Sequence, residues 1–359
     1  MSEFQISPNA KPIAADLRAA MLQDPGFGRV FTDHMVVIEW NEAKGWHDAR
    51  VEARGPLSID PACAVLHYAQ EIFEGLKAYR VPSGDVVLFR PDANARRFNE
   101  SAERMAMPSL PEDTFVEALE QLIRIDRDWI PEGEGSLYLR PFMFGSETFL
   151  GVKPSAEYKF IVIASSVGAY FKGGKPGISV WLSEHYTRAA RGGTGAAKCG
   201  GNYASSLIAQ KEAIGHGCDQ VVFLDAVEQR WVEELGGMNT FFVMDDGSLV
   251  TPPLGGTILP GITRDSLLTL ARAGGITVRE ERYAIDQWLE DARSGRLREA
   301  FACGTAAVIT PIVEVRGQTH NFTIGNGGPG IETMRLRDAL TAIQRGTAPD
   351  PHGWVRPVR

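Results

Sequence analysis

The sequence predicts a two-domain α+β protein, in which helices flank sheets that are mixed or antiparallel. Three observations support this prediction. The chain has 359 residues, more than the ~250–300 at which a single core usually stops growing. Strand-like and helix-like segments alternate, but without the steady strand–helix–strand repeat of a parallel sheet. A glycine- and proline-rich stretch, "YFKGGKPG", interrupts residues 170–177 and is typical of an interdomain connection. We therefore expect a smaller N-terminal α/β domain at 1–172, a linker region at 173–184 and a larger C-terminal domain at 185–359.

Composition and charge exclude several classes of function. Hydrophobic residues make up 44% and charged residues 23% of the chain, as in ordinary globular proteins. The net charge is −8, from 45 acidic and 37 basic residues, which argues against non-specific binding to nucleic acid. The strongly apolar run "FIVIASSVGAYF" is too short to span a bilayer, and the N-terminal segment lacks signal- and transit-peptide features. We expect a cytoplasmic protein that binds neither nucleic acid nor membrane.

The cysteines and histidines do not form a recognisable metal-binding pattern. Cysteines stand at positions 63, 199, 218 and 303, without a CxxC pair, and HExxH is absent. This spacing suits a reducing compartment and argues against a disulfide framework or structural zinc. We expect no metal site.

In the first half of the chain, β-branched and aromatic runs predict strands and periodic apolar residues predict helices. Phe115, Ala118, Leu119, Leu122 and Ile123 form one apolar stripe at helical spacing. The expected strands are 34–40, 86–90, 136–144 and 158–165, and the expected helices are 92–106 and 112–128.

The second half continues the mixture, beginning with the strand "ISVWLSE". Further expected strands are 219–225, 239–244, 276–280 and 299–303, and the expected helices are 203–214, 264–273, 285–294 and 330–345. The absence of a regular repeat favours mixed sheets over a doubly wound parallel sheet.

Lys198 lies in an unusually small and flexible setting, "GGTGAAKCGGNY" at 192–203, directly before an expected helix. The glycines allow a close backbone approach, and lysine can form a Schiff base with an aldehyde. The segment is not a phosphate loop, because G-x-x-x-x-G-K-[ST] is absent, and it lacks the third glycine of a dinucleotide fingerprint. An ordinary surface-loop lysine remains the alternative on local features.

Three other segments could contribute to a site. "LPGITRD" places Ile262 and Thr263 at a helix start, where backbone N–H groups can bind phosphate. "CGTAAVITP" offers Thr305 and neighbouring N–H groups to an anion. In "RWVEELGGMN", Glu233 or Glu234 could hold a pyridine nitrogen in its protonated state if it is buried. Taken alone, each segment is equally typical of an ordinary structural feature: a turn before a helix, a tightly packed turn, or a solvated strand edge.

Taken in order, these segments resemble the branched-chain amino-acid aminotransferase family, which uses pyridoxal phosphate on the fold-type IV scaffold. The resemblance spans most of the chain and includes "FTDHMVVIEW", "HYAQEIFEGLKAYR", "YLRPFMFG", "GGNYASSL", "MNTFFV", "LPGITRD" and "CGTAAVITP". It implies transfer of an amino group between L-leucine, L-isoleucine or L-valine and 2-oxoglutarate, giving branched 2-oxo acids and L-glutamate. It also implies a homodimer and a place in branched-chain amino-acid biosynthesis.

The resemblance assigns roles to the cofactor-binding residues. It implies that Lys198, on the larger domain, is the Schiff-base lysine and general base, that Tyr203 lies near the cofactor's O3′, and that Glu234 rather than Glu233 pairs with the pyridine nitrogen. Arg97 would bind the phosphate, with Arg96 beside it as the alternative. The remaining phosphate contacts would come from Ile262, Thr263 and Thr305.

The resemblance also implies a substrate pocket. Arg140 would bind the distal carboxylate of glutamate, with Tyr138 on the same strand. The other pocket residues would be Phe27, Tyr68, Phe73, Tyr170, Thr305 and Ala306.

One departure from the family concerns redox regulation. Some members of the longer branch carry a CxxC pair within the segment that corresponds to "CGTAAVIT", and Ala307 and Thr310 occupy those places here. We therefore expect no thiol switch of that kind.

The alternatives on the same scaffold are a D-amino-acid aminotransferase and an aminodeoxychorismate lyase, against which "YLRP" and "FEGLKAYR" favour the branched-chain L-enzyme. A non-catalytic phosphate-binding protein is the alternative from another class, and Lys198, Tyr203 and Glu234 together argue against it.

Overall fold

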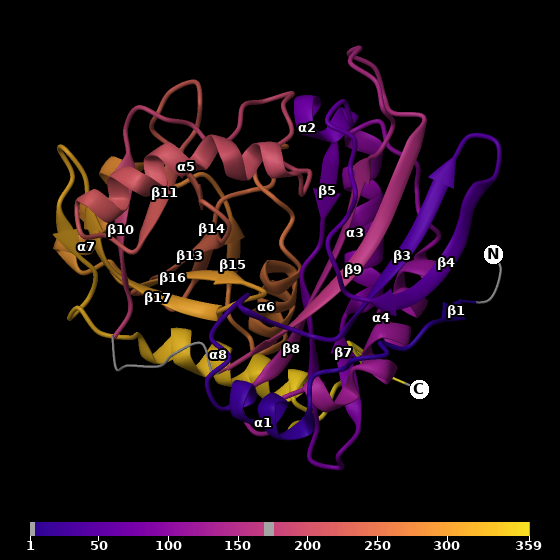
Figure 1. Ribbon diagram of the computed structural model, residues 1–359. Coiled ribbons are helices and arrows are strands. Elements are labelled where there is room, and N and C mark those ends of the chain that lie inside the picture. The colour runs from indigo at the N-terminus through magenta and orange to yellow at the C-terminus, as the bar shows by residue number, and fades with distance from the viewer. Residues whose placement is uncertain (1–3, 169–175, 359) are drawn as a thin grey trace. The chain divides into compact units, whose positions relative to one another are not determined.

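A computed structural model describes residues 4–168 and 176–358. The chain forms two compact units, each built on one sheet. Unit 1 contains residues 4–168, 197–200 and 343–358, and unit 2 contains residues 176–196 and 201–342. Figure 1 shows the chain and labels most of its elements. The prediction of mixed and antiparallel sheets with flanking helices is confirmed.

Unit 1 has a ten-stranded sheet in the order β1-β4-β3-β9-β8-β6-β7-β19, with β2 paired to β9 and β5 paired to β8. Every pairing is antiparallel except that of β1 with β4. The strands are β1 (Gln5–Ile6), β2 (Val30–Phe31), β3 (His34–Asn41), β4 (Gly45–Ala53), β5 (Glu71–Phe73), β6 (Leu76–Arg80), β7 (Val86–Phe89), β8 (Ser136–Gly145), β9 (Glu157–Val167) and β19 (Val355–Pro357).

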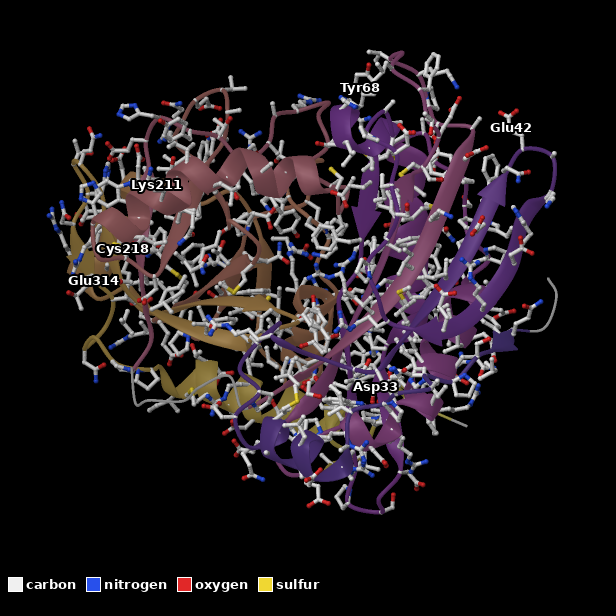
Figure 2. The ribbon with its side chains drawn as sticks, in the orientation of Figure 1. Asp33, Glu42, Tyr68, Lys211, Cys218 and Glu314 are labelled. Atoms are coloured by element: carbon white, nitrogen blue, oxygen red, sulfur yellow. The ribbon has the colours of Figure 1, made fainter. Side chains whose placement is uncertain are left out.

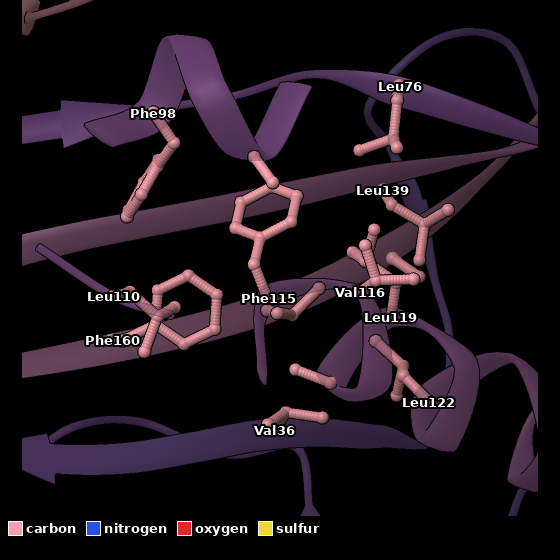
Figure 3. Close-up of a cluster of buried hydrophobic side chains, with 14 of the residues drawn as sticks. Val36, Leu76, Phe98, Leu110, Phe115, Val116, Leu119, Leu122, Leu139 and Phe160 are labelled. Atoms are coloured by element: carbon pink, nitrogen blue, oxygen red, sulfur yellow. The ribbon is translucent and has the colours of Figure 1, made fainter. Parts of the chain in front are cut away.

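Helices α3 and α4 cover one face of this sheet and enclose the core of unit 1. The helical elements are α1 (Ala15–Gln23), α2 (Ala64–Tyr68), α3 (Pro91–Arg104), α4 (Glu112–Ile125) and the short 3-10 helix η1 (Arg127–Trp129). The predicted apolar stripe of α4 is buried. Figure 3 shows Phe98 of α3, Phe115 of α4 and Phe160 of β9 within this core, and their ring centroids are 5.3–5.9 Å apart. The opposite face carries the site residues of β5 and β8 described below. It also carries a smaller apolar cluster that includes Phe144 and Ile161, against which Val65 of α2 packs.

Unit 2 has a nine-stranded mixed sheet in the order β12-β11-β10-β17-β16-β13-β14-β15, with β18 paired to β17. The pair Glu234↔Asn239 joins β12 to β13, so the six strands from β12 through β13 close into a ring. The strands are β10 (Ile178–Ser183), β11 (Gln220–Leu224), β12 (Val232–Leu235), β13 (Asn239–Met244), β14 (Leu249–Thr251), β15 (Val278–Glu280), β16 (Leu297–Gly304), β17 (Val308–Arg316) and β18 (Phe322–Thr323).

Four helices flank this sheet: α5 (Gly200–Gly215), α6 (Ile262–Ala273), α7 (Ile285–Ser294) and α8 (Ile331–Gln344). Trp288 of α7 is fully buried against Phe242 and Phe322. Figure 2 shows Lys211 on α5 and Cys218 just beyond that helix. None of the described helices is both long and apolar enough to cross a membrane.

The two units differ from the expected sequence division in three places. The expected linker includes β10, because Val180 and its neighbours pair with both β11 and β17. The last residues group with unit 1, because β19 pairs with β7. Residues 197–200 also group with unit 1, although the sequence places them in the C-terminal half.

Candidate functional site

In unit 1, the segment that carries Lys198 is fixed on two sides. Cys199 forms a β-bridge with Ile72, and the Phe73 N–H donates to the Lys198 carbonyl at 2.9 Å. The Lys198 N–H donates to Ser101 Oγ of α3, also at 2.9 Å. Helix α5 begins at Gly200, which confirms that Lys198 precedes a helix. The backbone of a glycine-rich segment is thus held in place while the half-buried side chain places Nζ 4.8 Å from the Phe73 ring centroid.

Arg97 of α3 lies next to this segment and forms a buried ion pair with Glu74. Its Nε and Nη2 donate to the two carboxylate oxygens at 2.7 and 2.8 Å, and Asn94 Nδ2 donates to the same carboxylate at 2.7 Å. Burial alone would raise the pKa of Glu74, but the Arg97 charge and hydrogen bond, with Lys198 and Asn94, outweigh it and lower the pKa. The neighbouring Arg96 is exposed and lies 3.8 Å from Glu112, so burial distinguishes Arg97 from Arg96.

Arg140 and Tyr138 project from β8 toward the same face as Phe73. The Arg140 guanidinium lies 4.7 Å from the Phe73 ring centroid, and its Nη2 donates to Tyr138 Oη at 3.0 Å. The Phe27 ring contacts Tyr138 edge-on, with centroids 5.2 Å apart. Among the described residues, Arg140 Nε is buried without a hydrogen-bond partner. A buried donor in this state favours an anionic ligand.

The remaining predicted aromatic residues of the pocket are not brought into a buried position by the described structure. Tyr68 lies on α2 (Figure 2), is exposed, and donates its hydroxyl to the Leu150 carbonyl. Phe27 is exposed too, despite its contact with Tyr138. Tyr170 lies outside the described residues.

In unit 2, Glu234 is a buried carboxylate surrounded by donors. It forms an ion pair with Arg188, whose Nη2 also donates to the Gly195 and Thr257 carbonyls at 2.8 Å. The Leu259 N–H donates to Glu234 Oε1 at 3.0 Å. The β12–β13 pairing places Asn239 opposite, and its Nδ2 donates to Oε2 at 3.2 Å.

The neighbouring Glu233 has a weaker set of partners. Its Oε1 accepts a hydrogen bond from Thr257 Oγ1 at 2.5 Å, whereas Oε2 is buried without a partner among the described residues. Burial raises the pKa of Glu233, although the Thr257 hydroxyl and the Arg188 charge oppose this shift. Of the two acids, Glu234 is therefore the one whose carboxylate oxygens both accept hydrogen bonds from the protein.

Helix α6 begins at Ile262 and has Gly261 as its N-cap, with no side chain capping it. Thr263 is buried in the first turn. A Cβ on Gly261 would lie 2.0 Å from Asn239 Oδ1, so a glycine is needed for the helix start to approach the Glu234 cluster. An uncapped helix N-terminus favours an anion such as phosphate.

Tyr203 and the turn containing Thr305 complete the predicted residues of unit 2. Tyr203 lies in the first turn of α5, and its Cε1 is 3.5 Å from where a Cβ on Gly237 would lie, just beyond β12. Thr305 and Ala306 form the half-buried turn between β16 and β17.

Several residues that support these groups were not singled out from the sequence. Glu74 and Asn239 stand inside the motifs "FEGLKAYR" and "MNTFFV", so their position next to predicted residues was the available signal. Arg188 stands among other arginines and glycines, and its pairing with Glu234 is visible only in the fold. The remaining supporting residues are Asn94, Ser101 and Thr257.

Comparison with known proteins identifies the family. Residues 71–315 match amino-transferase class IV. The branched-chain-amino-acid aminotransferase of Mycolicibacterium smegmatis is 56% identical over 358 residues, which cover 98% of this chain and 97% of that protein. The chain belongs to the branched-chain aminotransferases of class IV.

Solved structures of this family share the fold. The branched-chain amino acid aminotransferase of Escherichia coli has a TM-score of 0.74 and 31% identity, covering 90% of this chain and 99% of that one. The Thermobaculum terrenum enzyme, solved in its PLP form, has a TM-score of 0.72 and 27% identity, covering 90% and 98%. The chain is thus a transaminase of fold type IV, and the cofactor of this class of aminotransferases is pyridoxal 5′-phosphate.

The residues present fit this cofactor chemically. Pyridoxal phosphate requires an amine for its aldehyde, an acid for its ring nitrogen and an anion site for its phosphate. The chain supplies Lys198 on a fixed segment, the buried and donor-supported Glu234, and the uncapped start of α6 beside Gly261.

Proposed function

We propose that the protein transfers the amino group between L-leucine, L-isoleucine or L-valine and 2-oxoglutarate, giving branched 2-oxo acids and L-glutamate. The observation that carries the proposal is the Lys198 segment, which is hydrogen-bonded to Phe73 on one side and Ser101 on the other. Such bonding fixes the backbone position from which the lysine side chain projects.

Lys198 would act first as the cofactor's attachment point and then as the base. When bound, pyridoxal phosphate supplies a carbonyl carbon that bonds amines and a ring that accepts electrons. Lys198 Nζ would hold the cofactor until the substrate amine replaces it. The released amine would then take the proton from the substrate's Cα and deliver it to the cofactor's C4′.

Glu234 would keep a proton on the ring nitrogen. The contacts from Arg188, Asn239 and the Leu259 N–H favour its carboxylate form, which stabilises a cation placed against it. Tyr203 would lie near the cofactor's O3′, on the first turn of α5.

The phosphate would be bound by Arg97 and by backbone at the start of α6. Glu74 fixes the guanidinium of Arg97 through two hydrogen bonds, so little side-chain entropy would be lost when phosphate binds. Ile262, Thr263 and Thr305 would supply the remaining contacts, because an uncapped helix start favours an anion.

The substrate side chain would lie against Phe73, Tyr138 and Arg140. The aromatic rings suit a branched alkyl chain, and the buried, unpartnered Arg140 Nε suits the distal carboxylate of glutamate. Phe27, Tyr68, Tyr170, Thr305 and Ala306 are proposed to complete this pocket.

The attachment role of Lys198 predicts a visible absorbance band in the purified enzyme. Lys198→Ala should lose this band and essentially all transaminase activity, because no amine remains to bind the aldehyde. Lys211→Ala, which changes an exposed lysine on α5 (Figure 2), should keep both. A Lys198→Ala enzyme that retains the band would overturn the assignment.

A coupled assay separates the rival substrates. With 2-oxoglutarate as acceptor, we expect turnover of L-leucine, L-isoleucine and L-valine but not of D-alanine. Activity confined to D-alanine would instead favour a D-amino-acid aminotransferase, and lyase activity without transamination would favour an aminodeoxychorismate lyase.

We also propose that the enzyme is a cytoplasmic homodimer that serves branched-chain amino-acid biosynthesis. Exposed apolar side chains on α2 and the 146–152 loop support self-association, since they would be buried by a second copy. They are Leu66, Tyr68, Phe149, Leu150 and Val152. The four cysteines are buried and form no disulfide, which suits a reducing compartment.

A further inference from the structure

Strand β5 connects the strand that carries Arg140 to the segment that carries Lys198. On one edge, Glu71 pairs with Phe144 and Phe73 pairs with Phe142 of β8. On the other edge, Ile72 is bridged to Cys199, and the Phe73 N–H donates to the Lys198 carbonyl. A change in β5 can therefore affect both groups.

The register places Glu71 on the same face of the sheet as Arg140. Directly paired residues of antiparallel strands project to one side, and every second residue along a strand repeats that side. Glu71 and Phe73 thus share a face with Phe142, and Arg140 stands two residues before Phe142 on β8. Ile72 and Met143 point into the core on the other side.

The Glu71 carboxylate is held against the start of α5. It accepts a hydrogen bond from the Gly200 N–H, and a Cβ on Gly200 would lie 1.8 Å from Glu71 Oε1. Only glycine permits this approach. The carboxylate therefore lies against Gly200, two residues after Lys198. On the face that it shares with Arg140, Phe73 stands between the two charged residues, and the charge of Arg140 lowers the pKa of Glu71.

The proposed function makes a conflicting demand on Arg140. With 2-oxoglutarate or glutamate bound, its charge would be paired with the substrate's distal carboxylate. With a branched alkyl chain bound, the same half-buried guanidinium would face an apolar group, which is costly without a counter-charge. A second carboxylate nearby would remove this cost.

We propose that Glu71 is a specificity-determining positioning residue: its carboxylate, fixed by the Gly200 amide, is the counter-charge of Arg140 while an alkyl side chain is bound, and it gives way to the substrate's carboxylate when a dicarboxylate binds. This inference rests on the proposed function, because it acts through Arg140. Burial raises the pKa of Glu71, with the Gly200 N–H and Arg140 opposing. The Glu71 carboxylate is therefore protonated more readily when the distal carboxylate of a bound substrate comes close to Arg140.

The test is Glu71→Gln, which keeps an acceptor oxygen for the Gly200 N–H and removes the charge. We expect the KM for 2-oxoglutarate to fall and the KM for L-leucine to rise, each by roughly three- to tenfold, with kcat changed far less. In an enzyme that already carries Arg140→Gln, the addition of Glu71→Gln should change neither the KM for 2-oxoglutarate nor the KM for L-leucine. Glu42→Gln, at an exposed glutamate (Figure 2), controls for the change in net charge.

A purely structural role for Glu71 gives a different pattern. Glu71→Gln would then match the wild type, while Glu71→Ala, which also loses the acceptor, would lower kcat equally with both substrates. That result, or KM changes in the same direction for both substrates, would overturn the proposal. If the wild type transaminates neither L-leucine nor 2-oxoglutarate, the proposed function itself fails.

Discussion

Glu74 in unit 1 and Glu234 in unit 2 are both buried carboxylates paired with an arginine, but their partners come from different parts of the fold. For Glu74, the arginine and the amide partner both stand on one helix, α3: Arg97 contributes two parallel hydrogen bonds, and Asn94 a third. One helix therefore determines the position of this carboxylate. Such a fork-to-fork pair is geometrically specific.

The partners of Glu234 come from several separate segments. Arg188 reaches it through Nη2, the Leu259 N–H comes from the loop before α6, and Asn239 comes from the opposite strand. Arg188 Nε is buried without a hydrogen-bond partner among residues 4–168 and 176–358. The Glu234 cluster thus depends on the whole architecture of unit 2, whereas the Glu74 cluster is local support for Arg97. Loss of either acid removes the partner of a buried arginine and should lower stability. Only Glu234 is proposed to face the cofactor's ring nitrogen, so its loss should in addition lower kcat directly.

The largest expected effect is on the stability of Glu74→Ala. Removal of Glu74 takes away the carboxylate partner of a buried arginine, and loss of one member of such a pair costs about 3–5 kcal/mol in the free energy of unfolding. Urea denaturation at neutral pH measures it. Because the folded pKa of Glu74 lies below its ordinary value of 4.5, its contribution is complete above that pH and is lost as the pH falls through the folded pKa. The difference in the free energy of unfolding between the wild type and Glu74→Ala should therefore decrease at acidic pH.

A Glu74→Ala enzyme as stable as the wild type at neutral pH would contradict the distinction between the two clusters. Glu74→Gln is the matched control, since it keeps hydrogen-bond acceptance without the charge. It should be destabilised less than Glu74→Ala.

The next effect is catalytic. Glu234→Gln should lower kcat by about 10²-fold or more, comparable to the loss of one well-placed group at a charged reacting centre, because a neutral amide cannot hold a proton on the ring nitrogen. Single-turnover kinetics with L-leucine measures it. Glu228→Gln, an exposed acid on the same stretch of chain, should leave kcat unchanged. A Glu234→Gln enzyme within about threefold of wild type would exclude Glu234 from the assigned role.

The sequence predicts the elements better than their ends. Expected helix 285–294 has the bounds of α7, because its apolar spacing directly reflects burial of Trp288 and its neighbours. Expected helix 112–128 instead ends at Ile125, since Asp126 turns away to bind the ring and backbone N–H of His34 at 2.7 and 3.1 Å. Helix α1 was not predicted, because none of its residues is buried and it therefore has no apolar stripe.

The candidate site shows the same limit. Lys198 could be predicted because its glycine-rich setting is a local property of the chain. The contacts that hold it, from Phe73 and Ser101, join positions about a hundred or more residues away, and no local pattern specifies them. The preference for Glu234 over Glu233 likewise depends on donors that only the folded sheet brings together.

The smallest expected effect sharpens that choice between adjacent acids. Glu233→Gln should leave kcat within about twofold of wild type, because the amide can still accept the Thr257 hydrogen bond. Burial raises the folded pKa of Glu233 above its ordinary value of 4.5, so its stabilising effect is present below that value and is lost as the pH rises through the folded pKa. Glutamine does not titrate, so the Glu233→Gln enzyme does not lose stability in this way as the pH rises. Relative to wild type, the Glu233→Gln enzyme should therefore gain stability in urea denaturation as the pH rises from about 4 to 7; a kcat loss as large as that of Glu234→Gln would show that the two acids have been assigned the wrong way round.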